Sequence, residues 1–89
     1  MRVVFLYHPN SEQAGKVMDY AHEYTQRHPG IEPELISLET REGAEMAALY
    51  GVTNYPAILA ISRDGSLQQL WQEQQLPLMQ DLDAYAFAF

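Results

Sequence analysis

The sequence contains no cysteine among its 89 residues. Disulfide bonds, thiolate nucleophiles and cysteine-based zinc sites are therefore excluded for this chain, as is dithiol redox chemistry. Basic residues are also scarce, because five Lys and Arg stand against twelve Asp and Glu, for a formal net charge of -7. Binding to a nucleic-acid backbone requires clustered basic side chains, so we expect no nucleic-acid partner.

Long apolar segments are missing as well. No apolar run approaches the roughly 20 residues that a membrane-spanning helix needs. The first apolar run, residues 1–7, ends at His8-Pro9 without a small-residue cleavage site, so we do not expect a signal peptide. An acidic surface is also repelled by anionic lipids. We therefore expect a cytoplasmic protein with no membrane partner.

The chain nevertheless has enough apolar material for a hydrophobic core. Hydrophobic residues make up 47% of it. A chain of this length forms one domain, which we place at residues 1–89. We find no internal repeat and no linker that would divide it.

Alternation and helical spacing of apolar residues predict seven elements. The runs at 3–7 and 56–61 are apolar on both alternating faces, which is typical of strands buried on two sides. Asp64-Gly65 is a hairpin signal between the last two strands. We expect strands at residues 3–7, 35–38, 56–61 and 67–72, and helices at 11–27, 41–50 and 78–86.

Residues suited to helix ends flank two of the predicted helices. Asn10 or Ser11 is expected to cap the first helix, and Thr40 the second. Gly51 is expected to end the second helix, because glycine readily adopts the left-handed conformation found there.

The predicted order of elements is β-α-β-α-β-β-α, which indicates an α/β fold. A right-handed crossover makes the first two strands parallel, and the hairpin makes the last two antiparallel. A mixed four-stranded sheet with helices on both faces then buries every apolar stripe.

The segment Tyr50 to Leu59, with the sequence YGVTNYPAIL, resembles the thioredoxin family. In that family a helix ending in Tyr-Gly-Val is followed by a cis-proline that opens the third core strand. The resemblance implies a minimal thioredoxin-like fold with strand order 2-1-3-4, lacking the extra strand and helix that begin full-length thioredoxins. It also implies a cis bond between Tyr55 and Pro56.

The redox motif of that family is missing. Thioredoxins and glutaredoxins carry Cys-x-x-Cys where the first core strand meets the first core helix. By the resemblance, Ser11 stands in place of the nucleophilic cysteine and Ala14 in place of the resolving one. The resemblance therefore implies a redox-inactive member of the family.

The residues around these positions are our candidate binding site. In redox-active relatives the cis-proline loop faces the active-site helix, and the backbone before the proline pairs with extended peptides. We therefore expect a non-catalytic domain that binds a protein or peptide here, although the loop can also be retained as an element of the fold without a ligand. The candidate residues are Pro9, Asn10, Ser11, Ala14, Asn54, Tyr55 and Pro56.

Two other functions stay open. Ser11, with His8 three residues away, is the candidate centre of a glutathione-dependent or serine-based enzyme acting on a small molecule, although no acidic residue is evident to orient the histidine. The alternating tail at 84–89 carries Phe87 and Phe89, which favours a structural, self-associating module, although packing of the C-terminus on the domain is an equal alternative. We expect a monomer or a weak homodimer.

Metal ions and cofactors are not expected. His8, His22 and His28 lack a ligand spacing, and we expect them to be exposed or half-buried. The acidic stretch 32–45 lacks the Asp-x-Asp-x-Asp-Gly pattern of a calcium loop. The ring of Trp71 is expected to cover the core.

Overall fold

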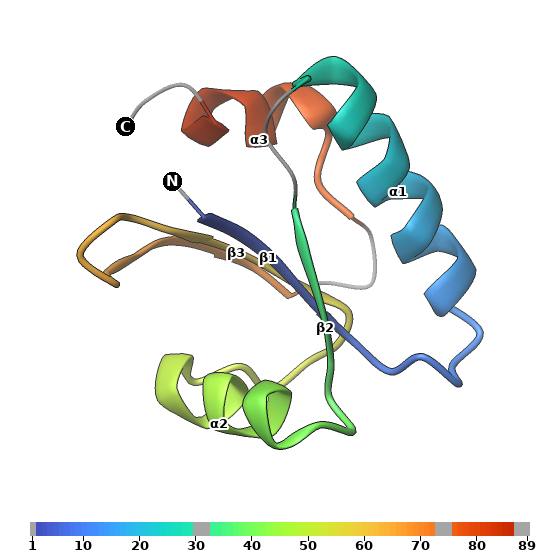
Figure 1. Ribbon diagram of the computed structural model, residues 1–89, viewed down its shortest axis with the longest axis vertical. Coiled ribbons are helices and arrows are strands. Elements are labelled where there is room, and N and C mark those ends of the chain that lie inside the picture. The colour runs from blue at the N-terminus through green and yellow to red at the C-terminus, as the bar shows by residue number, and fades with distance from the viewer. Residues whose placement is uncertain (1, 30–32, 73–75, 87–89) are drawn as a thin grey trace.

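The computed structural model describes residues 2–29, 33–72 and 76–86. It contains the seven expected elements in the expected order, so the predicted α/β class is confirmed (Figure 1). They are β1 (Arg2–Tyr7), α1 (Ala14–Arg27), β2 (Glu34–Ser37), α2 (Arg41–Tyr50), β3 (Ala57–Ile61), β4 (Leu67–Trp71) and α3 (Met79–Ala86).

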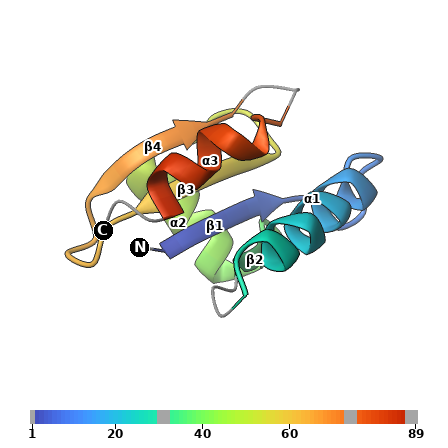
Figure 2. The ribbon, with the colours of Figure 1, turned by 90° about the horizontal axis from the view of Figure 1, so that it is seen from above.

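The strands form one sheet in the order β2-β1-β3-β4, which confirms the predicted topology. β1 pairs in parallel with β2, while β3 is antiparallel to both β1 and β4. Figure 1 shows α1 and α3 on one face of the sheet and α2 on the other. Figure 2, which looks from above, shows α3 over the β3–β4 side and α1 towards β2.

The sheet separates two hydrophobic cores. Successive strand residues point to opposite faces, so β1 sends Phe5 towards α1 and Leu6 towards α2. All five residues of β3 are buried, as expected for a central strand. The core on the α1 side contains Val3, Phe5, Val17, Ala21, Tyr24, Ile58 and Leu82. The core on the α2 side contains Val4, Leu6, Ile36, Ala47, Val52, Ala57, Leu59 and Ile61.

The ends of α2 follow the sequence closely. The side chain of Thr40 accepts a hydrogen bond from the backbone N–H of Gly43 at 3.1 Å, which confirms the predicted cap. Gly51 ends the helix with a φ of 68°, a left-handed conformation that glycine adopts without steric cost.

The predicted start and cap of α1 are wrong. The helix begins at Ala14, with Gln13 at the N-cap and no side-chain cap. The hydroxyl of Ser11 instead donates to the carbonyl oxygen of His8 at 2.7 Å. Serine side chains bond to nearby backbone in this way and so favour a turn over a helix. Residues 11–13 therefore form a turn that delays the helix.

The prediction for His28 is also wrong. His28 is 4% exposed, because its ring packs on Tyr24 with centroids 4.7 Å apart and its Nε2 lies 2.6 Å from a carboxylate oxygen of Asp83. Sequence spacing could not reveal an acidic partner 55 residues away. Trp71 packs against the core on the α1 side, as expected.

The hydroxyl of Tyr24 is buried without a hydrogen-bond partner among the described residues, and burial raises its pKa. Replacing Tyr24 with Phe removes this desolvated hydroxyl and keeps the ring. We expect the free energy of unfolding to rise by about 1 kcal/mol, measured by urea denaturation. The matched control is Tyr20→Phe, which removes a hydrogen bond to the carbonyl oxygen of Pro77 at 2.8 Å and should cost about 1 kcal/mol. Equal losses in both variants would contradict the prediction.

No helix in the described part of the chain combines the length and apolar character required to span a membrane.

Candidate functional site

Two loops meet at one end of the sheet. Because β1 and β3 are antiparallel, with Leu6 opposite Ala57, the loop that leaves β1 lies beside the loop that enters β3. The rings of His8 and Tyr55 connect them edge to face, with centroids 5.3 Å apart and an interplanar angle of 82°. The Tyr55–Pro56 bond is cis, the geometry that the family resemblance implies. The structure thus brings the two halves of the candidate site together.

A second contact ties the loop after β1 to the turn between β2 and α2. The amide group of Asn10 donates to a carboxylate oxygen of Glu39 at 3.0 Å. The backbone N–H of Leu38 donates to the carbonyl oxygen of Tyr7 at 2.9 Å, which holds the same turn against the end of β1. The position of Asn10 is therefore set by a side chain 29 residues away.

Gln72, just after β4, holds the loop before the cis-proline. Its Oε1 accepts hydrogen bonds from the backbone N–H of Thr53 at 2.9 Å and of Asn54 at 3.3 Å. The hydroxyl of Tyr55 donates to the carbonyl oxygen of Val52 at 3.3 Å. The bonds to Gln72 tie the loop to the end of β4, and the bond from Tyr55 to Val52 lies within the loop itself.

The seven candidate residues differ in their exposure to solvent. Pro56 is buried and Tyr55 and Ala14 are half-buried. The remaining candidates are exposed: Pro9, Asn10, Ser11 and Asn54. Among the described residues, neither the N–H nor the C=O of Tyr55 bonds to another backbone group. We call the surface formed by these seven residues the cis-proline face.

The surroundings of Ser11 bear on the enzymatic alternative. Its hydroxyl donates to a backbone carbonyl, and the ring of His8 packs on Tyr55. Within the described ranges, no side-chain base accepts a hydrogen bond from this hydroxyl. The arrangement of nucleophile, base and orienting group that activates a serine is thus not assembled by these residues.

The histidines lie apart from one another. The ring of His22 bonds to Gln26 at 3.0 Å, His28 contacts Asp83, and His8 contacts Tyr55. No group of three or more potential metal ligands occurs in residues 2–29, 33–72 and 76–86. The predicted self-association through the aromatic tail depends on the side chains of residues 84–89, and these side chains lie outside what the structure describes.

The sequence prediction named the residues of the cis-proline face but not the contacts that hold them together. The contact of His8 with Tyr55 and the hydrogen bonds that Gln72 accepts join segments that are distant in the chain. The glutamines between 68 and 75 were the only signal for Gln72, and the sequence does not indicate which of them meets the loop before the cis-proline.

A mixed four-stranded sheet of order 2-1-3-4 between three helices is a thioredoxin-like fold. The structure is similar to the solution structure of "a putative disulphide-isomerase from Bacteroides thetaiotaomicron", with a TM-score of 0.67 and 18% sequence identity, covering 98% of this chain and 77% of that chain. The sequence matches no protein-family model and no curated protein. At this identity the likeness shows the fold alone. This chain has no cysteine with which to exchange disulfides.

Proposed function

We propose that this chain is a redox-inactive member of the thioredoxin-like family that binds an extended protein segment or peptide at the cis-proline face. The observation that carries the proposal is the ring contact between His8 and Tyr55, which places the turn containing Ser11 beside the cis-proline loop. Binding there is non-covalent, because the positions of both motif cysteines are taken by Ser11 and Ala14.

The backbone of Tyr55 supports a peptide as the ligand. Its N–H and C=O have no backbone partner among the described residues, and both groups require one when a ligand covers them. An extended peptide supplies a carbonyl and an amide at the matching spacing, as in strand addition. The exposed side chains of Asn10, Ser11 and Asn54 would contact its side chains.

The charge of the chain favours a basic peptide. The net charge is -7, and Glu39 lies beside the face through its bond to Asn10. Electrostatic attraction raises association rates for a partner of opposite sign and repels acidic ones. The cytoplasmic location and the lack of nucleic-acid and membrane partners remain predictions that accompany this proposal.

A titration followed by NMR tests the proposal. The probe is an unstructured, lysine-containing 12-residue peptide with alternating valine and threonine, added to the ¹⁵N-labelled chain. We expect amide shifts to cluster at residues 10–14 and 54–57, because peptide backbone and side chains contact both loops. Binding that leaves these amides unchanged would overturn the assignment of the face, and so would an absence of binding.

A pair of serine variants sharpens this test. Ser11→Trp places a large ring on the cis-proline face and should weaken peptide binding about tenfold or more. Ser66→Trp alters an exposed serine in the hairpin turn between β3 and β4, which lies at the opposite end of the sheet, and should bind as the wild type does. Equal weakening by both variants would show that the tryptophan acts through the fold rather than through the face.

A further inference from the structure

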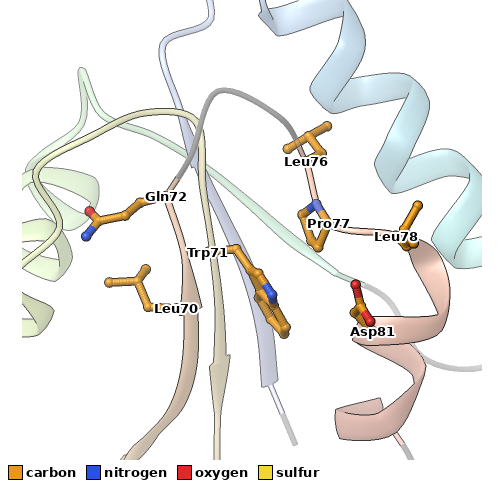
Figure 3. A pocket seen from close by; sticks show the side chains of 7 residues that line it. All are labelled: Leu70, Trp71, Gln72, Leu76, Pro77, Leu78 and Asp81. Atoms are coloured by element: carbon orange, nitrogen blue, oxygen red, sulfur yellow. The ribbon is translucent and has the colours of Figure 1, made fainter.

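A pocket of about 590 Å³ lies between the end of β4 and the start of α3 (Figure 3). It is distinct from the cis-proline face, and no residue of that face lines it. Its volume lies within the range of small-molecule binding sites. The lining residues are Leu70, Trp71, Gln72, Leu76, Pro77, Leu78 and Asp81. We call it the Trp71 pocket.

Trp71 forms one wall of this pocket. Figure 3 shows its indole ring directed towards Pro77 and Asp81, while the side chains of Leu70 and Gln72 point to the other side of β4. This alternation follows from the strand, since Leu70 belongs to the core on the α2 side. Trp71 is half-buried, so the residue keeps part of its surface in contact with solvent.

Asp81 forms the facing wall, and its carboxylate is exposed. Among the described residues it takes part in no hydrogen bond or ion pair through its side chain. Three of the five basic residues are paired elsewhere, Arg2 with Glu34, Arg27 with Asp83 and Arg41 with Glu45. The other two, Lys16 and Arg63, do not line the pocket either.

Acidic residues of α1 and α3 lie near Tyr20, which is bonded to the pocket wall. The hydroxyl of Tyr20 donates to the carbonyl oxygen of the lining residue Pro77. Burial, together with the nearby acidic groups Glu23, Asp81 and Asp83, raises the pKa of Tyr20 to about 12. The surroundings of the pocket thus attract cations.

We propose that the Trp71 pocket binds the guanidinium group of an arginine side chain presented by a protein partner. A planar guanidinium stacks on an indole face and donates two parallel hydrogen bonds to a carboxylate, and the Trp71 pocket offers both partners on facing walls. An ammonium group has no flat surface to stack and makes no such fork. The inference goes beyond the proposed function, because it concerns a second site with its own ligand.

Trp71 is the sole tryptophan of the chain, so its fluorescence reports on the pocket directly. The probes are N-acetyl-arginine methylamide and N-acetyl-citrulline methylamide, in which a neutral urea replaces the guanidinium. We expect a saturable change in emission with the arginine probe, whose binding should weaken with added salt, and at least fivefold weaker binding of the citrulline probe.

An eight-residue peptide with one central arginine should bind more tightly than the arginine probe, as expected for a partner's side chain. Equal binding of the arginine and citrulline probes would overturn the proposal, and a peptide no tighter than the arginine probe would overturn the protein partner.

Variants of Asp81 test whether its negative charge, rather than the stability of the fold, is responsible for binding of the arginine probe. Asp81→Asn should weaken binding of the arginine probe about fivefold, and Asp81→Glu should retain it. Glu45→Gln, an equal change of charge at an exposed residue on the opposite face of the sheet, should bind as the wild type does. Thermal unfolding confirms that each variant is folded. Unchanged binding in Asp81→Asn would contradict the assigned site. Because no residue of the cis-proline face lines this pocket, the two proposals can fail separately.

Discussion

Replacing Gly43 with alanine is expected to lower the free energy of unfolding by about 2–3 kcal/mol. A Cβ atom at this position would lie 2.1 Å from the backbone oxygen of Ser37 and 2.9 Å from its carbonyl carbon. Both are backbone atoms at the end of β2, so no side chain can rotate to make room. The first turn of α2 would have to move away from the sheet.

Gly15 provides the matched control for this prediction. It also lies in a helix, near the start of α1, and a Cβ added there meets nothing within 4 Å. Alanine favours helix over glycine by up to about 1 kcal/mol, so Gly15→Ala should stabilise the protein slightly. Urea denaturation of both variants measures the contrast. A loss of less than about 0.5 kcal/mol in Gly43→Ala would show that α2 does not depend on this close approach.

Replacing Asp83 with alanine should lower the free energy of unfolding by about 1–3 kcal/mol at neutral pH. Asp83 joins α3 to the end of α1, since one carboxylate oxygen lies 2.6 Å from Nη2 of Arg27 and the other 2.6 Å from Nε2 of His28. His28 is buried, so removal of the carboxylate takes a partner from a ring that water does not reach. Asp81→Ala, on the same helix but without such contacts, should cost only about 0.3–1 kcal/mol, the contribution of an acidic residue in the first turn of a helix.

The same carboxylate makes stability depend on pH. The hydrogen bond from Arg27, together with that from His28, holds the pKa of Asp83 below its ordinary value. The ionised form is therefore favoured in the folded state, and its contribution is complete above the unfolded pKa of about 3.9. The contribution is lost as the pH falls below that value through the lower folded pKa.

Urea denaturation between pH 7 and pH 2 measures this effect. The wild type should lose more stability below pH 4 than Asp83→Ala does. Some acid sensitivity should remain in the variant, because Arg2 likewise lowers the pKa of Glu34. Parallel pH profiles for the two proteins would contradict the role assigned to Asp83.

The sequence was sufficient to predict the fold because local patterns determine its elements. The two-sided apolar runs of β1 and β3 can be buried only in the middle of a sheet, and Thr40 and Gly51 mark the ends of α2. The start of α1 was not predictable from capping preferences, since Ser11 can bond either to a helix or to its own turn. Only the surrounding structure decides between these two.

The sequence was sufficient to propose where the candidate site lies, but not which side-chain contacts hold it together. The family resemblance matched Ser11 to the position of the nucleophilic cysteine and Pro56 to that of the cis-proline. The contacts of His8, Asn10 and Gln72 were not predictable, because each partner lies far away in the sequence. These partners are Tyr55, Glu39 and the backbone of Thr53. The Trp71 pocket lay beyond sequence reasoning altogether, because its walls come from β4 and from the start of α3.

Gln72 contributes to both proposed sites. Its side chain binds the amides of Thr53 and Asn54 before the cis-proline, and the same residue lines the Trp71 pocket. A single ligand that reaches both sites makes its second contact at an effective concentration set by the segment that joins its two contacts. Where that segment spans the two sites, such linkage raises affinity by up to about 10²–10⁴-fold over either contact alone. The chain would then select partners by the spacing between an extended segment and an arginine, a form of recognition that neither site achieves separately.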